Sequence, residues 1–209
     1  MTTTHQLDLF GASQPAHNPV ITLPGADLLY YPTFFDKPEA DRLFAQLLTG
    51  IAWQQDVIRM YGRDIPLPRL SAWYGDDDKP YTYSGITLTP RPWTPVLQLI
   101  RERLEAVAGA RFSSVLLNRY RNGKDHISWH TDAEKELGPN PVIGSVNFGA
   151  TRRFMLRRID DHAVKHEVEL RHGTLLVMGG ATQHYWQHQV PKTSADIGER
   201  LNLTFRLIR

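Results

Sequence analysis

Cysteine is absent from this chain of 209 residues. Its absence excludes disulfides, iron–sulfur clusters and thiolate zinc sites, so histidines and carboxylates remain as the metal ligands. Long blocks of like charge and internal repeats are missing too. The chain has 41% hydrophobic residues, 22% charged residues and a net charge of +2, which is the composition of an ordinary globular domain. The mildly basic pI of about 8.9 permits a nucleic-acid partner but does not by itself indicate one.

Apolar runs of the length that crosses a bilayer, about 20 residues, are also absent. The first 19 residues have no basic segment followed by an apolar run, so we expect no signal peptide. We therefore expect a cytoplasmic monomer without a membrane partner. Residues 1–20 are polar and broken by glycine and prolines, which predicts a mobile tail.

Two helices are predicted in the first half of the chain. Residues 35–50 offer Asp36 as an N-cap and an apolar stripe at helical spacing. Residues 93–109 begin with Thr94 and a proline and end at a glycine. The segments between them are rich in Tyr, Trp, Pro and Gly, and this composition favours hairpins and loops.

From residue 112 onward, short strand-like runs are separated by turn residues. This spacing is typical of sandwiches and barrels. We predict a mainly β (α+β) fold: a jelly-roll, or double-stranded β-helix, core with the two helices packed outside. The expected organisation is a tail over 1–20, helices and hairpins over 21–111, and the core over 112–209.

The stretch "ISWHTD" places His130 and Asp132 two residues apart at the end of a predicted strand. Side chains at i and i+2 of an extended chain lie on the same side, so these two converge. His188, in "YWQHQV", offers a third ligand from a distant strand. Two histidines and one carboxylate form the facial triad of non-haem Fe(II) oxygenases, although zinc accepts the same ligands. Alone, the His–Asp pair indicates no more than a surface contact.

The last predicted strand, "RLNLTFR", alternates polar and apolar residues. Its polar face carries two cations, which a barrel interior tolerates only where they meet anions. Arginine binds carboxylates through two parallel hydrogen bonds, so a dicarboxylate such as 2-oxoglutarate fits this face. The alternative is a solvated outer face on an edge strand. The polar residues are Arg200, Asn202, Thr204 and Arg206.

Four stretches together resemble the AlkB family of Fe(II)/2-oxoglutarate dioxygenases, and most closely its animal DNA-repair members: "LLNRYRNGKDHISWHTD", "SVNFGATRRFMLR", "HGTLLVMGGATQHYWQHQVPK" and "RLNLTFR". The resemblance implies Fe(II), 2-oxoglutarate and O2 as cofactor and cosubstrates. It assigns iron binding to His130, Asp132 and His188. Contacts to 2-oxoglutarate are implied for Asn118, Tyr120, Arg200, Asn202 and Thr204, and Arg206 is expected to pair with its distal carboxylate.

The resemblance also implies a reaction, the oxidative demethylation of 1-methyladenine and 3-methylcytosine in DNA. Its products are succinate, CO2 and formaldehyde. The methylated edge of such a base is inaccessible in a duplex, so the base must be flipped out or single-stranded. Tyr83 is expected to stack on the base with Tyr81 nearby, and Glu134 to accept a hydrogen bond from its exocyclic amine. The alternatives are two core tyrosines and a solvated turn carboxylate.

The stretch "RMYGRDIPLPRL" resembles the hairpin that the double-strand repair member inserts into DNA. Tyr61 stands where that wedge is expected, and Arg63 and Arg69 are predicted phosphate contacts. Ala133 replaces a second aspartate of the animal relatives, and "VPKTSADIGE" has one lysine where the double-strand member is strongly basic. We therefore expect single-stranded DNA to be at least as good a substrate as duplex. A further basic strip, more simply explained as a solvated face, consists of Arg152, Arg153, Arg157 and Arg158.

The segment "QLDLF" resembles the peptide by which bacterial repair proteins bind the DNA sliding clamp. A mobile tail that orders on binding suits this role. We expect a clamp partner and, with it, a location at the bacterial nucleoid. The residues concerned are Gln6, Leu7, Asp8, Leu9 and Phe10. The alternatives to DNA demethylation are the same chemistry on RNA or protein, a non-catalytic binding module, and a zinc hydrolase.

Overall fold

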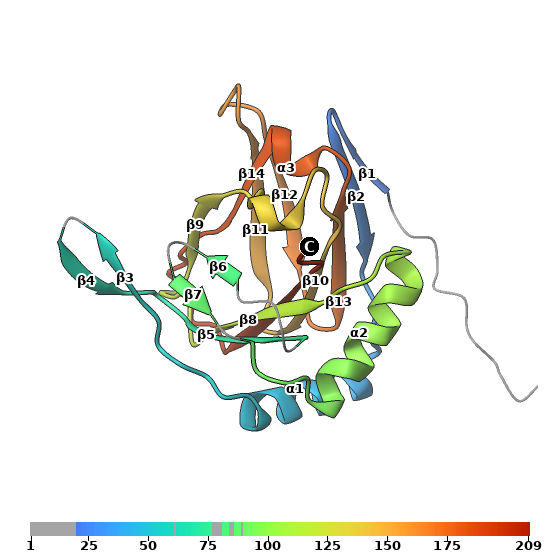
Figure 1. Cartoon of the computed structure of the whole chain (residues 1–209), viewed down its shortest axis with the longest axis vertical. Coiled ribbons are helices and arrows are strands. Elements are labelled where there is room, and N and C mark those ends of the chain that lie inside the picture. Colours follow the sequence, from blue (N-terminus) through green and yellow to red (C-terminus); the bar gives the residue numbers. More distant parts are fainter. Residues whose placement is uncertain (1–19, 61, 77–80, 84–85, 89) are drawn as a thin grey trace, which may run out of the picture.

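Two antiparallel sheets face one another in the computed structural model of the chain (Figure 1). The larger sheet has the order β1 (Val20–Leu23), β2 (Ala26–Tyr31), β13 (Thr174–Gly179), β10 (Ile143–Gly149), β15 (Arg200–Arg206), β8 (Ser114–Tyr120) and β5 (Leu70–Gly75). The smaller sheet has the order β12 (Lys165–Leu170), β11 (Arg152–Arg158), β14 (Trp186–Val190) and β9 (Ile127–His130). The predicted jelly-roll sandwich is confirmed.

The structure describes residues 20–60, 62–76, 81–83, 86–88 and 90–209, with the backbone alone given for Met60 and for residues 81–83 and 86–88. Tyr61 and the clamp-like segment 6–10 therefore lie outside the described residues, as do the side chains of Tyr81 and Tyr83.

Helices α1 (Lys37–Gly50) and α2 (Pro95–Ala108) pack on the outer face of the larger sheet (Figure 1). The predicted N-cap at Asp36 and the predicted helix start at Thr94 are confirmed. The Asp36 side chain accepts a hydrogen bond from the backbone N–H of Glu39, and the Thr94 side chain accepts one from the backbone N–H of Leu97. Gly109 ends α2 with φ 61°, a left-handed conformation that glycine adopts without steric cost. These helices cover an apolar core to which β15 contributes Leu201, Leu203 and Phe205.

The larger sheet also includes β1, β2 and β5, which precede residue 112. The sequence predicted only helices, hairpins and loops there. β2 pairs with β13, more than 140 residues later in the chain, and β5 pairs with β8. Such distant pairing leaves no local signal, because each strand is short and its partner is remote in sequence. No helix within the described ranges is long and apolar enough to span a bilayer.

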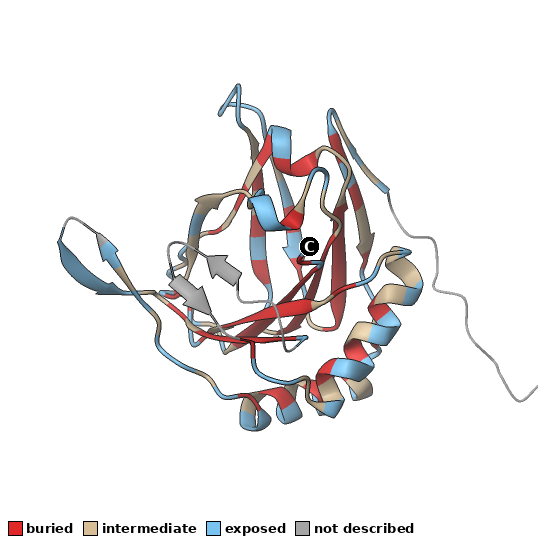
Figure 2. Ribbon diagram, viewed as in Figure 1, coloured by how far each residue is buried: buried red, intermediate tan, exposed pale blue. Residues whose placement is uncertain are grey.

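Two small hairpins lie outside the sandwich. One consists of β3 (Val57–Met60) and β4 (Arg63–Pro66), and the other of β6 (Tyr81–Tyr83) and β7 (Ile86–Leu88). The β3–β4 hairpin projects from the body and is exposed along β4, as the pale blue strands of Figure 2 show. Such a hairpin is available to a large partner.

Candidate metal centre and anion pocket

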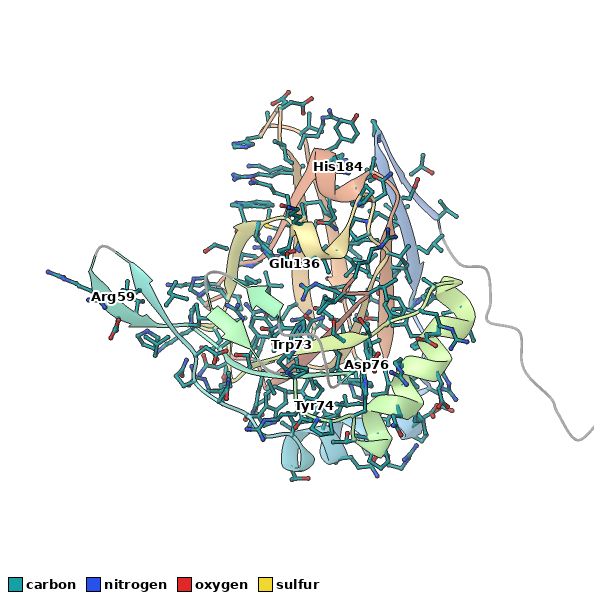
Figure 3. All side chains as sticks on the ribbon, in the orientation of Figure 1. Arg59, Trp73, Tyr74, Asp76, Glu136 and His184 are labelled. Atoms are coloured by element: carbon teal, nitrogen blue, oxygen red, sulfur yellow. The ribbon has the colours of Figure 1, made fainter. Side chains whose placement is uncertain are left out.

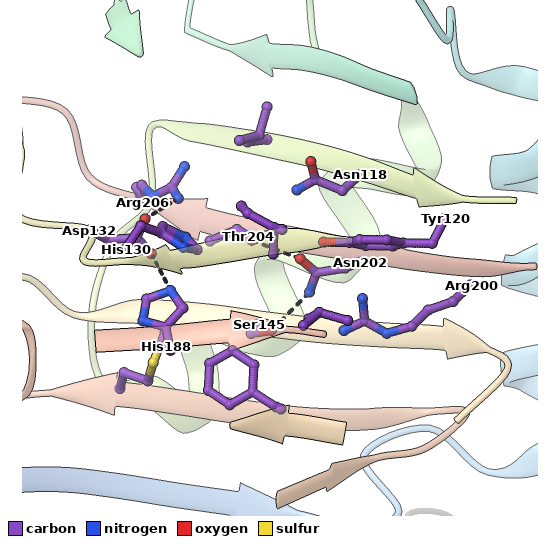
Figure 4. A pocket seen from close by; sticks show the side chains of 15 residues that line it. Asn118, Tyr120, His130, Asp132, Ser145, His188, Arg200, Asn202, Thr204 and Arg206 are labelled. Atoms are coloured by element: carbon purple, nitrogen blue, oxygen red, sulfur yellow. Dashed lines mark hydrogen bonds and ion pairs between the residues drawn. The ribbon is translucent and has the colours of Figure 1, made fainter. Parts of the chain in front are cut away.

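The predicted metal ligands converge between the two sheets. His130 ends β9, His188 lies opposite it on β14, and Asp132 follows in the turn after β9. The ligand atoms of the three residues all lie within 4.8 Å of one another. Figure 4 shows them together at one end of a cavity. The convergence predicted from the "HTD" spacing is confirmed.

The two histidines are held in orientations that suit metal binding. His130 Nδ1 lies 2.8 Å from the carbonyl oxygen of Ser128 and donates a hydrogen bond to it, so Nε2 is the ring nitrogen left for a metal. The His188 ring stacks on Phe154 with centroids 5.1 Å apart, and its Nε2 lies 3.8 Å from Asp132 Oδ2. Both imidazoles therefore reach the same point with fixed rings.

Asp132 is 1% exposed and is held from two sides. Its Oδ1 accepts a hydrogen bond of 2.7 Å from Arg206 Nη2, and its backbone N–H donates to Gln183 Oε1 at 2.9 Å. Burial raises the pKa of the carboxyl, but Arg206 and the two histidines outweigh it and lower the pKa to about 2. Asp132 is thus an ionised ligand at neutral pH. The role of Gln183, on α3 (Thr182–Tyr185), has no signal in the sequence pattern.

His188 is a neutral ligand at neutral pH. Burial is the largest cause that lowers the pKa of His188, and the neighbouring His130 lowers it further. Asp132 opposes the shift, and the resulting pKa is about 3, against an ordinary value of 6.5. A metal ion binds neutral imidazole, so His188 needs to lose no proton when the metal binds.

We expect the metal-free protein to lose stability as the pH falls from 7 to 4.5. Between pH 6.5 and about 3 the unfolded His188 binds a proton that the folded form excludes, which favours unfolding. At pH 4.5, two units below the unfolded pKa, this single group costs roughly 3 kcal/mol. Urea unfolding of the wild type and of His188→Asn at both pH values measures the effect. The variant should lose about that much less stability, and an equal loss in both proteins contradicts the assignment.

The polar face of β15 lines the inner side of the larger sheet. Arg200, Asn202, Thr204 and Arg206 are all buried there, and β15 lies between β10 and β8. The alternative of a solvated edge strand is therefore wrong. The alternation along this strand was sufficient to predict which residues share a face.

The two arginines lie at opposite ends of the cavity (Figure 4). Arg206 is beside the metal ligands and pairs with Asp132. Arg200 lies six residues earlier on the same extended strand, so the Cα atoms of the two arginines are about 20 Å apart by the rise of 3.3 Å per residue. Arg206, which was expected to meet the distal carboxylate of a cosubstrate, thus lies beside the metal ligands, and Arg200 occupies the end remote from them.

Arg200 is a buried cation, 1% exposed. Its Nη2 donates to the neutral amide of Asn147 at 2.6 Å, and its guanidinium lies 5.0 Å from the ring centroid of Tyr120. Within the described part of the chain, Nε and Nη1 have no hydrogen-bond partner. Burial is the main cause that lowers its pKa, to about 10, so it remains charged. A charge in this situation is stabilised by an anion that enters the cavity.

All nine residues predicted for iron and cosubstrate line one cavity. Ser145 and Asn147 of β10 were missed, although Asn202 Nδ2 donates to Ser145 Oγ at 2.9 Å. They are two polar residues at i and i+2 in the otherwise apolar stretch "VIGSVNFG", which is a signal that could have identified them. The nine residues are Asn118, Tyr120, His130, Asp132, His188, Arg200, Asn202, Thr204 and Arg206.

Two arginines are buried where the sequence predicted a phosphate contact (Arg69) and a solvated basic strip (Arg152). Arg69 is 4% exposed and donates to Asn118 Oδ1, so it is not a phosphate contact. Arg152 is also buried and donates to the backbone carbonyls of Asp125 and Pro191. The other three arginines of the basic strip each have a partner on the protein itself. Arg153 pairs with Glu167, Arg157 stacks over Trp129, and Arg158 pairs with Asp160.

Glu134 follows the metal ligands by two residues and is half-buried. Its Oε2 is buried and has no hydrogen-bond partner among the residues that the structure describes. A buried carboxylate oxygen without a partner is suited to a hydrogen-bond donor on a bound ligand.

Comparison with known proteins identifies relatives over most of the chain. The family model of the 2OG-Fe(II) oxygenase superfamily matches residues 27–206. The human alpha-ketoglutarate-dependent dioxygenase alkB homolog 3 is 44% identical over 187 residues, an alignment that covers 85% of this chain and 65% of that protein. The mouse DNA oxidative demethylase ALKBH2 is 40% identical over 188 residues, covering 85% and 79%. The chain thus spans less than two thirds of the length of the human relative.

Solved structures share the fold. OsALKBH1 superposes with a TM-score of 0.64 at 18% identity, covering 90% of this chain and all of that one. An oxidoreductase of the 2OG-Fe(II) oxygenase family from Burkholderia pseudomallei superposes with a TM-score of 0.57 at 16% identity, covering 86% and 84%. At these identities the likeness shows the fold alone.

Proposed function

The chain belongs to the AlkB family within the 2OG-Fe(II) oxygenase superfamily, and on this basis we propose that it is an Fe(II)/2-oxoglutarate-dependent dioxygenase that demethylates nucleic-acid bases. One observation carries the proposal. A two-histidine, one-carboxylate group and a buried arginine with unsatisfied nitrogens stand at the two ends of one cavity. A ligand with a chelating end and an anionic end fits between them.

The donor set fits Fe(II). His130, Asp132 and His188 would hold the ion through two imidazoles and one carboxylate, the ligand set of non-haem Fe(II) oxygenases. Arg206 keeps the Asp132 carboxylate ionised and fixed, and the Ser128 carbonyl fixes the His130 ring. Bound Fe(II) would supply an oxidation by O2 that converts 2-oxoglutarate to succinate and CO2 and releases the methyl group of the base as formaldehyde.

The far end of the cavity fits the distal carboxylate of 2-oxoglutarate. Arg200 offers Nε and Nη1, and the ring of Tyr120 lies against its guanidinium. Asn202 and Thr204 extend the polar lining toward the metal ligands. Arg200 thus neutralises the distal carboxylate and orients the cosubstrate, so that its keto acid end reaches the ligand group.

The base is proposed to enter beside Glu134. The buried Oε2 of Glu134 is placed to accept a hydrogen bond from the exocyclic amine that adenine and cytosine share. The substrates proposed are therefore 1-methyladenine and 3-methylcytosine, presented by flipping or in a single strand. The backbone of β6–β7 carries Tyr81 and Tyr83, the proposed stacking residues.

The projecting β3–β4 hairpin supports a nucleic-acid substrate. Arg59 and Arg63 lie on its exposed strands, and Figure 3 shows Arg59 on the hairpin, far from the sandwich. Cations there are suited to phosphate contacts, which position a strand without specifying its sequence. The chain has one lysine in residues 190–199 and Ala133 after Asp132, which favours single-stranded DNA at least as much as duplex.

A panel of methylated oligonucleotides tests the proposal. Single-stranded DNA, duplex DNA and single-stranded RNA, each with 1-methyladenine or 3-methylcytosine, are incubated with protein, Fe(II), 2-oxoglutarate and air. We expect mass spectrometry to record loss of the methyl mass, fastest in single-stranded DNA or equally fast in duplex. If methyl loss is fastest in RNA, the proposed substrate becomes RNA. Methyl loss by Asp132→Ala, or no loss from any strand, contradicts it.

A sliding-clamp partner is a second proposal, supported by the sequence "QLDLF" and by the proposed role in DNA repair. Deletion of residues 6–10 is expected to abolish binding to the bacterial clamp, measured by surface plasmon resonance, because the clamp-binding residues are lost. Turnover on free oligonucleotides should stay unchanged. Clamp binding that survives the deletion refutes this role. A nucleoid location is proposed on the same ground.

A further inference from the structure

Arg69 lies in the short segment between β4 and β5 and contacts Asn118, which lines the proposed cosubstrate pocket. The Arg69 side chain is 4% exposed. Its Nε donates to Asn118 Oδ1 at 2.7 Å, and its Nη1 donates to the carbonyl oxygen of His126 at 3.5 Å. Arg69 therefore connects the base of the β3–β4 hairpin with β8, which lines the pocket, and with the loop that leads to the metal ligand His130.

The bond to Asn118 decides which way the amide faces. Arginine has five donors and no acceptor, so it binds the oxygen of the asparagine amide and not the nitrogen. With Oδ1 held by Arg69, the Nδ2 group is left for the pocket, and Figure 4 shows it on the side of the metal ligands. A pocket for a dicarboxylate needs donors on its walls. The flipped amide would instead present an acceptor to an anionic ligand.

The backbone around Arg69 is fixed on both sides, so the side chain starts from a defined position. The carbonyl oxygen of Arg69 accepts a hydrogen bond of 3.1 Å from Gln55 Nε2. Its N–H donates to the carbonyl of Leu67, and the carbonyl of Pro68 accepts from the N–H of His126. Hydrogen bonds thus join three segments around Arg69: Gln55 before β3, the residues that follow β4, and His126 before β9.

We propose that Arg69 is a positioning residue for cosubstrate binding. It acts through Asn118, whose amide it orients so that N–H groups face the bound 2-oxoglutarate, and it places a positive charge behind that amide. The proposal rests on the proposed function, since it names the residue that prepares one wall of the same pocket.

A double-mutant cycle between Arg69 and Asn118 tests it. The Kd of 2-oxoglutarate is measured by calorimetry without O2, on protein loaded with Mn(II) in place of Fe(II). We expect Arg69→Gln to weaken binding about tenfold, which corresponds to one charge-assisted hydrogen bond. Asn118→Ala should weaken binding by a similar factor. Arg69→Gln added to Asn118→Ala should change the Kd less than twofold, because the amide that Arg69 orients is gone.

Controls separate positioning from general damage. The exposed Arg153→Gln carries the same chemical change on β11 and should leave the Kd unchanged. The Kd of Mn(II) alone should be the same in every variant. Arg69→Lys keeps a donor and the charge, so its affinity should lie between those of wild type and Arg69→Gln, and it decides the question if Arg69→Gln does not fold.

Two results overturn the proposal: wild-type affinity in Arg69→Gln or Arg69→Lys, or a full tenfold loss from Arg69→Gln in the Asn118→Ala background. Either leaves the proposed function intact. If wild type binds Mn(II) but no 2-oxoglutarate, the proposed function fails instead, and the two failures are thereby distinguished.

Discussion

Replacing Arg200 with methionine is expected to weaken 2-oxoglutarate binding by about 100-fold, since it removes the buried, charged donor proposed to bind the distal carboxylate. The same change should leave the apoprotein as stable as wild type or more stable. Arg200 is buried with two nitrogens that lack partners in the described residues, and an apolar side chain of similar volume avoids that cost. Calorimetry with the Mn(II)-loaded protein and urea unfolding measure the two quantities.

Arg119 supplies the matched control for this experiment. It lies on the neighbouring strand β8, pairs with Glu199 and does not line the cavity. Arg119→Met should leave the affinity for 2-oxoglutarate unchanged. An Arg200→Met protein that binds 2-oxoglutarate as tightly as wild type would show that the remote anion site is assigned wrongly.

Replacing Asp132 with alanine is expected to abolish metal binding and to lower the free energy of unfolding by about 3 kcal/mol. The first effect follows from loss of the carboxylate ligand. The second follows from the 2.7 Å pair with Arg206, whose 3% exposed guanidinium would keep its charge without that carboxylate. Metal content after gel filtration and urea unfolding measure the two effects separately.

The double variant Asp132→Ala/Arg206→Met distinguishes the two roles of this pair. It should recover most of the lost stability, because the buried cation is gone, while metal binding stays absent. If Asp132→Ala unfolds at the wild-type urea concentration, the pair does not contribute to folding as described.

The sequence was most informative where one strand carries a whole pattern. Alternation in "RLNLTFR" assigned four polar side chains to one face, and the "HTD" spacing predicted that His130 and Asp132 converge. Both are local signals of period two. The helix caps at Asp36 and Thr94 are local in the same way.

What the sequence could not supply depends on contacts between distant strands. Alternation assigns Arg200 and Arg206 to one face but does not say which of them meets the metal ligands. Arg69 follows an exposed hairpin in sequence, and only the pairing of β5 with β8 buries it against Asn118. Gln183 reaches Asp132 from a helix 51 residues later. Each of these roles requires knowledge of which strands are neighbours.

The most direct test of the proposed activity measures two products in one reaction. Single-stranded DNA with one 3-methylcytosine is incubated with the Fe(II)-loaded protein and 2-oxoglutarate in air, and methyl loss and succinate are quantified together. The account predicts one succinate for each methyl group lost and no loss without 2-oxoglutarate. Methyl loss that needs no 2-oxoglutarate, or succinate formation that leaves every methyl group on the DNA, would contradict it.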